Sequence, residues 1–363
     1  MTRQLHLGLF IYPAGHHIAA WRHPSVDPAA IAGIDYYRRV AQIAERAKFD
    51  LFFVGDMLAA REKDGRVVAE GGLNNLDSIS ITSALSAVTE CLGFVATLST
   101  TYNEPYAIAE RFASLDHISA GRAGWNIITT ANDDAAYNFS RKSHMEKVRR
   151  YERAREFVQV CKALWDSWDD DGSKHRIEHE GEFFSVSGPS ALPRPVQGWP
   201  VVIYRDHGQC DLRDSVSAYA DLVIAALPDI DAARSFRREL DSARDGRPRR
   251  PLLIASMMPV LARTTAEAEQ RAKQLDHWSR CALPSFVGTP EEFASELVRW
   301  HKSGACDGFD IKPAVMPLDL DFICLEAMPQ LRRALGPDAD RPAAGTLRER
   351  LGLDRPASQY GAA

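Results

Sequence analysis

The chain has 363 residues, of which 45% are hydrophobic and 26% charged, and its formal net charge is −5. This is the composition of a globular protein with a large core, and the negative charge argues against nucleic acid or an anionic membrane as a partner. The six cysteines are scattered without a CxxC pair, so we expect a reducing, cytoplasmic location and neither a zinc ribbon nor a redox dithiol. The N-terminal apolar run is too short for a signal peptide, and no apolar stretch approaches the length of a membrane span.

Eight short apolar runs alternate with segments of helical period. The runs are residues 5–12, 49–56, 92–100, 123–130, 200–205, 222–227, 252–260 and 308–314. The clearest helical pattern covers 144–168, and others lie at 35–49, 76–90, 105–118, 264–278 and 290–303. Continuous apolar strands separated by helices predict a parallel sheet covered on both faces, and eight such units predict a closed (β/α)8 TIM barrel of the α/β class. An open, doubly wound sheet is the alternative, although it more often has fewer strands.

Two segments fall outside this alternation. Residues 169–199 contain "HRIEHEGEFFSVSG", which predicts a small hairpin and a Pro-rich connection inserted before the fifth strand. Residues 336–363 are rich in Pro and Ala before "TLRERLGLDRP" and are predicted to wrap the surface. We therefore expect a single barrel domain over 1–335, with the insertion at about 169–199, and a C-terminal extension over 336–363.

Polar and aromatic residues collect where the predicted strands end, which is where barrel enzymes place their chemistry. They are Tyr12, Asp56, Thr97 to Thr101, Asn126 to Thr130, Tyr204, Arg205 and Lys312. Several have a structural alternative: Asp56 as a helix cap, Thr97 as a core hydroxyl, Asn126 as a turn residue and Trp125 as core. The residues predicted to line a substrate pocket at this end are Phe10, Tyr12, His17, Trp125, Tyr204 and His207.

Common ligand-binding motifs are missing from the sequence. His175 and His179 have the spacing of metal-binding helices, but they lie in a predicted strand, where four residues span roughly 13 Å. No metal site is therefore predicted. The chain has no GxxxxGK[ST], GxGxxG or GxSxG motif, so neither a phosphate-cradling loop nor a nucleophile elbow is expected.

The combination of several stretches resembles the bacterial luciferase superfamily. The stretches are "AERAKFDLFFVGD" (44–56), "ATLSTTYNEPYAIAERFASLDHISAGRAGWNIITT" (96–130), "RRYERAREFVQVCKALWDSW" (149–168) and "GTPEEFASELVRWHKSGACDGFDI" (288–311). Together with "GHHIAAWRHP" (15–24) and "GTLRERLGLDRP" (345–356), they are similar to the branch that contains nitrilotriacetate monooxygenase, dibenzothiophene sulfone monooxygenase and pristinamycin synthase. The resemblance covers nearly the whole chain.

This resemblance implies a luciferase-like barrel that acts as a monooxygenase with reduced FMN (FMNH2) and O2. In that chemistry a flavin C4a-peroxide transfers one oxygen atom to a small organic substrate. Members of the branch receive reduced flavin from a separate NAD(P)H:flavin reductase and form homo-oligomers, so we expect a reductase partner and a homodimer or homotetramer. The missing GxGxxG motif agrees with this expectation, and the barrel would have to keep water away from the activated flavin.

The resemblance also assigns cofactor-binding positions. Asp56, Thr97 and Asn126 match residues around the isoalloxazine ring. Tyr151 matches a helix Tyr that reaches the phosphate or the ribityl chain. Lys147 stands where the family usually has a His, four residues before that Tyr, and could serve as a counter-charge for the phosphate.

The loop after the fifth strand departs from the family. In place of a Gln-Ala-Gly-x-Ser-like turn that holds the phosphate, the chain has "IYRDHGQCDLRDS" (203–215). Arg205 and Gly208 could form a different phosphate site, because Arg suits bidentate phosphate contacts, or the loop could weaken FMN binding. A barrel without flavin, or one that uses another cofactor such as a deazaflavin, is therefore the alternative function. The segment between the seventh and eighth strands is also shorter than the branch leads us to expect, which predicts a reduced substrate lid.

Overall fold

The computed structural model describes residues 4–59, 62–63, 66–67, 76–206, 219–242, 250–279, 285–336 and 345–360. Eight parallel strands form its centre: β1 (His6–Ile11), β2 (Leu51–Val54), β5 (Gly93–Ser99), β6 (Ala123–Ile128), β9 (Val201–Asp206), β10 (Leu222–Ala225), β11 (Leu252–Leu261) and β13 (Gly308–Ile311). Each strand pairs with the next along the chain, and β13 pairs with β1, which closes the ring. The predicted (β/α)8 barrel is confirmed, and the open sheet is excluded.

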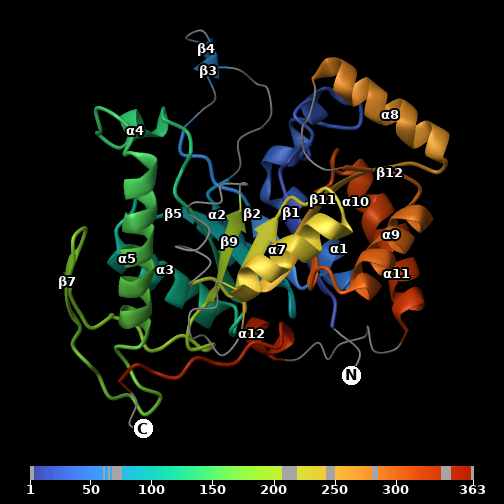
Figure 1. The fold of residues 1–363 in the computed structure, drawn as a ribbon. Helices are drawn as coiled ribbons and strands as arrows, with labels where there is room; N and C mark the ends of the chain where they lie inside the picture. The colour runs from blue at the N-terminus through green and yellow to red at the C-terminus, as the bar shows by residue number, and fades with distance from the viewer. Residues whose placement is uncertain are drawn as a thin grey trace.

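Helices surround this barrel (Figure 1). The longer ones are α1 (Ile34–Arg46), α2 (Ser78–Ser86), α3 (Pro105–Ile118), α5 (Lys147–Trp165), α7 (Ile230–Ser242), α8 (Thr265–Trp278), α9 (Pro290–Ser303) and α11 (Met328–Leu335); short α4 (Ala135–Asn138), α10 (Leu318–Asp321), η1 (Ala20–Arg22), η2 (Ala30–Ala32) and η3 (Phe322–Ala327) add to them. The sequence sets both ends of α9. Thr289 and Glu292 form a capping box before Pro290, and Gly304 ends the helix at a φ of 73°.

The barrel interior is apolar over most of its length. Inward positions alternate with outward ones along each strand, because successive side chains of a strand point to opposite faces. The inward positions fill the bore with large aliphatic and aromatic side chains: Leu51, Phe53, Val95, Val201, Ile203, Leu222, Ile224, Leu252 and Ile254. The barrel is thus a packed core with no open channel at this level.

The C-terminal segment closes the barrel at the amino ends of the strands, where α12 (Leu347–Arg350) lies below the sheet in Figure 1. Leu347 and Leu351 are fully buried in the cluster that fills the bore. Arg348 holds Asp221 with two hydrogen bonds of 2.7 and 3.2 Å. The sequence prediction placed this segment on the surface, but its two leucines belong to the core, because the open end of the barrel needs apolar cover.

Three smaller features complete the fold. The insertion contains the expected hairpin, formed by β7 (Glu178–Glu180) and β8 (Ser185–Ser187). Two further elements were not predicted: the hairpin of β3 (Glu62–Lys63) and β4 (Arg66–Val67), and β12 (Ser285–Gly288), which pairs with the outer end of the long strand β11. Within the described ranges, no helix has the length and apolarity needed to cross a membrane.

Candidate active site at the barrel mouth

Several polar side chains enter the bore toward the carboxyl ends of the strands. Most of them take the inward position that follows a small or apolar one on the same strand, so that Thr97 follows Val95 and Arg205 follows Ile203, whereas Lys312 follows Asp310 just beyond β13. The inward polar residues are Thr97, Asn126, Arg205, Ser256, Asp310 and Lys312, and all of them are buried or nearly so. Since α12 plugs the other end, these groups define one mouth where a ligand can meet polar partners.

Asn126 and Thr97 form a buried pair on the adjacent strands β6 and β5. The Asn126 Nδ2 donates to Thr97 Oγ1 at 3.0 Å, and Ser78 Oγ donates to the Thr97 carbonyl at 2.7 Å. The Asn126 Oδ1 is buried and has no hydrogen-bond partner among the residues that the structure describes. A buried acceptor without a donor costs about 1–3 kcal/mol, so this oxygen is a place where an N–H group of a ligand would be stabilised.

Trp125 points in the opposite direction from Asn126. Its side chain is fully buried, its Nε1 donates to the Leu98 carbonyl at 3.2 Å, and its ring packs against Phe112, Phe157 and Trp165 on the helical side of the sheet. The prediction that Trp125 lines a substrate pocket is therefore corrected. Its structural alternative holds, because the strand's two-residue period sends neighbouring side chains to opposite faces.

Arg205 lies across the bore at the base of the mouth. Its guanidinium donates to Asp310 Oδ2 at 3.0 Å, and its Cζ lies 4.7 Å from the centroid of the Phe10 ring. Ser256 Oγ donates to the same Asp310 oxygen at 3.3 Å, and Lys312 Nζ lies 4.0 Å from it. We call Phe10, Arg205, Ser256, Asp310 and Lys312 the floor cluster, because they form the floor of the mouth.

His16 stands beside the floor cluster and was not selected from the sequence. Its ring centroid lies 4.8 Å from that of Phe10 and 4.5 Å from that of Tyr12, and its Nε2 lies 2.9 Å from the Phe10 carbonyl. Burial, followed by the charges of Lys312 and Arg205, lowers the pKa of His16 well below its ordinary value, and the bond to Phe10 opposes this. His16 is therefore neutral near pH 7. Its Nε2–H donates to that carbonyl, so Nδ1 is left as an acceptor.

Two other predicted pocket residues lie elsewhere. The Nε2 of His17 contacts Asp276 of α8 at 3.3 Å, and its Nδ1 accepts from the Ala19 amide, so both nitrogens are used away from the mouth. Tyr204 occupies the outward position between Ile203 and Arg205, in the cluster of outer apolar side chains that includes Tyr151. In each case a sequence neighbour faces the mouth: His16 does so in place of His17, and Arg205 in place of Tyr204.

The predicted phosphate-binding groups are divided between two places. Lys147 is exposed at the first residue of α5, and Tyr151 is buried one turn later. Arg150, between them, bonds the Thr130 carbonyl, and its Nε is buried with no hydrogen-bond partner within the described part of the chain. Arg205 is not with this group, since it points into the bore. His207 and Gly208 lie outside the described residues.

Asp56 follows β2 and is partly buried at the mouth end. Burial and the neighbouring Asp77 raise the pKa of its carboxyl to about 6, and a hydrogen bond from the Met57 amide opposes the shift. The alternative reading as a helix cap does not hold for α2, because Asp77 is the residue that caps it, by accepting from the Ser80 amide at 2.8 Å. Asp56 thus carries a carboxyl that is about half ionised at mildly acidic pH.

This raised pKa gives a testable pH dependence. The pKa of the Asp56 carboxyl is near its ordinary value of 3.8 in the unfolded chain and about 6 in the folded protein. The ionised carboxyl therefore destabilises the fold, with its full effect above about pH 6 and no effect below about pH 4, where the carboxyl is protonated in both states. We expect Asp56→Asn to raise the Tm by roughly 2 °C at pH 7.5, after allowance for solvent screening. Scanning calorimetry of both proteins should show the difference vanish near pH 4. A difference independent of pH would contradict the assignment.

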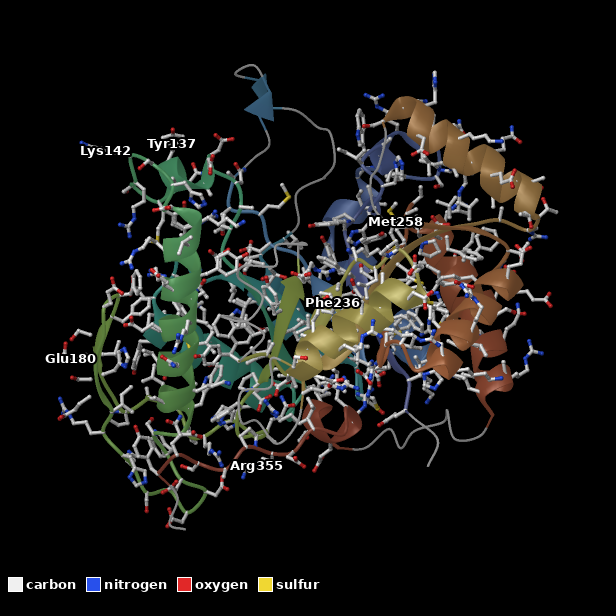
Figure 2. All side chains as sticks on the ribbon, in the orientation of Figure 1. Tyr137, Lys142, Glu180, Phe236, Met258 and Arg355 are labelled. Atoms are coloured by element: carbon white, nitrogen blue, oxygen red, sulfur yellow. The ribbon has the colours of Figure 1, made fainter. Side chains whose placement is uncertain are left out.

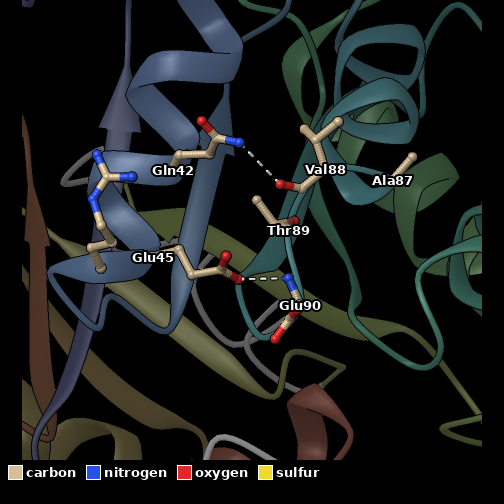
Figure 3. A pocket seen from close by; sticks show the side chains of 7 residues that line it. Gln42, Glu45, Ala87, Val88, Thr89 and Glu90 are labelled. Carbon is tan, nitrogen blue, oxygen red and sulfur yellow. Dashed lines mark hydrogen bonds between the residues drawn. The ribbon is translucent and has the colours of Figure 1, made fainter.

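A separate hollow of about 480 Å³ opens at the other end of the barrel (Figure 3). It lies between the end of α1 and the loop after α2 and is lined by Gln42, Glu45, Arg46 and residues 87–90. Glu45 Oε1 accepts from the amides of Glu90, Cys91 and Leu92 at 2.6–3.0 Å. That carboxylate is already satisfied and fastens the loop to α1, so the hollow offers no reactive group comparable with those at the mouth.

Comparison of the sequence with known proteins shows the family of the chain. A sequence model described as luciferase-like monooxygenase matches residues 11–282. The chain belongs to this family. N-acetyl-S-(2-succino)cysteine monooxygenase of Bacillus subtilis is 31% identical over 99% of this chain and 98% of its own length. Nitrilotriacetate monooxygenase component A of Aminobacter aminovorans is 31% identical over 98% of both.

Solved structures of luciferase-like barrels match along the whole chain as well. EDTA monooxygenase from Chelativorans sp. BNC1 has a TM-score of 0.85 at 28% identity, covering 97% of this chain and 99% of that one. A riboflavin lyase, described with modified FMN and riboflavin, has a TM-score of 0.84 at 27% identity and covers 97% of both. The resemblance to the nitrilotriacetate monooxygenase branch, predicted from the sequence, is thereby confirmed.

Proposed function

We propose that this luciferase-like protein is a two-component monooxygenase that uses reduced FMN, supplied by a separate reductase, and O2 to oxygenate a small organic substrate. The observation that carries the proposal is the buried, unpartnered Asn126 Oδ1 at the mouth. An acceptor fixed by Thr97 suits an N–H group at the edge of a flavin ring. The names of the relatives, which are monooxygenases of nitrilotriacetate, EDTA and N-acetyl-S-(2-succino)cysteine, support the reaction class.

The ring end of FMN fits the residues present. Asp56 follows β2, and Thr97 and Asn126 lie near the carboxyl ends of the next two barrel strands, β5 and β6, so the three residues can border one face of a planar ligand. Bound reduced flavin would supply the electrons that activate O2. The chain would hold the ring at the mouth, and the apolar bore below it, which α12 seals, would keep water from entering behind the ring.

The phosphate end fits the start of α5 better than the bore. Lys147 and the partly unsatisfied Arg150 lie within the first turn of this helix, where the helix dipole also favours an anion. Tyr151 can add a hydroxyl donor. Arg205 is better suited to another role, because its guanidinium is paired with Asp310 inside the barrel.

The test of the proposal is reduced-flavin binding with and without the Asn126 amide. We expect the protein to bind FMNH2 under anaerobic titration and to consume O2 when a flavin reductase is added. Asn126→Ala should weaken FMNH2 binding about two- to tenfold, because one hydrogen bond to a ligand contributes about 0.5–1.5 kcal/mol. Exposed Asn138→Ala is the matched control and should bind as the unmodified protein does. Absence of FMNH2 binding would instead favour a barrel without flavin or with a deazaflavin.

A further inference from the structure

The floor cluster spans the bore. Arg205 comes from β9 and Asp310 from β13, and β10 and β11 lie between these two strands in the ring. The 3.0 Å bond from Arg205 Nη2 to Asp310 Oδ2 therefore crosses the interior of the barrel and does not join neighbouring strands. The Arg205 side chain is 11% exposed and that of Asp310 is fully buried, so a ligand that enters the mouth reaches Asp310 past Arg205.

One donor and one acceptor of this ion pair are left without partners. Asp310 Oδ2 accepts from both Arg205 and Ser256, whereas Oδ1 is buried and has no hydrogen-bond partner among the described residues. Arg205 Nε is also buried and has no acceptor within the described ranges. In a guanidinium, the Nε–H lies on the same edge as Nη2, the group that Arg205 turns to Asp310. The two unsatisfied atoms therefore belong to the facing sides of one ion pair.

These two atoms specify the hydrogen-bonding character of a ligand group. Asp310 Oδ1 requires a donor, and Arg205 Nε–H requires an acceptor. A carboxylate can only accept and an ammonium group can only donate, so either would leave one buried atom unsatisfied. A hydroxyl group does both through one oxygen atom, and one atom suits two side chains that already share a hydrogen bond. An ordered water has the same capacity and is the competing occupant.

We propose that the floor cluster is a subsite for a hydroxyl group of the substrate, which donates to Asp310 Oδ1 and accepts from Arg205 Nε–H. The hydroxyl completes a buried polar network that is otherwise only partly satisfied, so it gains free energy from groups already in place. Because a hydroxyl is neutral, its binding does not depend on the net charge of the cluster. The proposal names a substrate class and rests on the proposed function, because it takes the flavin to lie above this floor.

The test compares two isomers that differ in their donor. Hexanol and methyl pentyl ether have the same atomic composition, and both can accept a hydrogen bond, but only the alcohol can donate one. Their binding to the full chain is measured by ligand-observed NMR, with and without FMN. We expect the alcohol to bind at least about fivefold more tightly than the ether, because the ether leaves a buried acceptor unpaired.

Two variants test the two atoms separately, and thermal unfolding verifies that each is folded. Asp310→Asn keeps an oxygen acceptor for Arg205 and presents an N–H donor in place of Oδ1, so the preference for the alcohol should disappear. Arg205→Lys keeps the positive charge and lacks the Nε–H, so both probes should bind more weakly while the alcohol remains preferred. The comparison of the isomers in the unmodified chain needs neither variant.

A matched control is Arg355→Gln, which removes a guanidinium paired with Asp170 near α12, at the opposite end of the molecule from the mouth (Figure 2). It should keep the preference for the alcohol. Equal binding of alcohol and ether, or no binding of either, would overturn the proposal and leave an ordered water as the occupant. So would an Asp310→Asn protein that keeps the preference, or displacement of hexanol by FMN, since the flavin would then occupy the floor. Preferred binding of hexanol without any FMN binding would refute the flavin function and leave the subsite standing.

Discussion

Trp125→Ala is expected to lower the free energy of unfolding by about 3–5 kcal/mol, the cost usually found when a large buried aromatic side chain is truncated. The indole is fully buried between β6 and helices α3 and α5, where it touches the rings of Phe112, Phe157 and Trp165. Removal of the ring would leave a cavity that these rigid neighbours cannot close. It would also leave the Leu98 carbonyl without its donor. Urea unfolding followed by circular dichroism measures the loss.

Trp125→Phe separates the two contributions. It keeps most of the aromatic packing and removes the hydrogen bond, so it should cost clearly less than the alanine variant and should leave FMNH2 affinity unchanged. A Trp125→Phe protein of normal stability that binds FMNH2 poorly would show that the indole faces the ligand after all. The adjacent Asn126→Ala is expected to show the reverse behaviour, with weaker flavin binding and little loss of stability.

The contrast between these two neighbours shows what the sequence could predict. Period-two alternation places Trp125 and Asn126 on opposite faces of a strand, but it does not say which face is the bore. The barrel itself was predictable, because eight apolar runs separated by helical segments leave few other arrangements. The same reasoning located the mouth, since the polar residues follow the apolar ones at the carboxyl end of each strand.

The pairing inside the mouth could not be predicted. Arg205 and Asp310 are separated by 105 residues, and nothing local to either indicates that one reaches the other across the bore. Arg205 was therefore assigned to the phosphate from its place in the altered loop. The choice between His16 and His17 failed for a similar reason: both follow the same strand, and only the chain's turn after Pro13 decides which ring meets Phe10.

The C-terminal segment was assigned to the surface because it is rich in Pro and Ala before a stretch in which charged residues alternate with leucines. In "TLRERLGL" the arginines and glutamate suggest a solvated surface. In the fold, Arg348 and Arg350 instead pair with Asp221 and Asp50 at the amino ends of the strands, and this arrangement turns the leucines inward. Those two carboxylates also accept from the amides of Val202 and Leu7 on adjacent strands. The pattern becomes interpretable only when the barrel end that it covers is known.

Leu347→Ala is accordingly expected to lower the free energy of unfolding by about 2–5 kcal/mol, the range found for truncation of a buried leucine. Leu347 is fully buried, and its side chain packs so closely on the backbone at Gly93 that a Cβ there would lie 2.6 Å from Leu347 Cδ1. The surrounding strand ends are fixed by the barrel and cannot collapse into the space left by the missing atoms. Leu325→Ala, on an exposed side chain of η3, is the control and should cost little. Comparable losses in the two variants, measured by denaturant unfolding, would mean that the segment only covers the surface and does not seal the barrel.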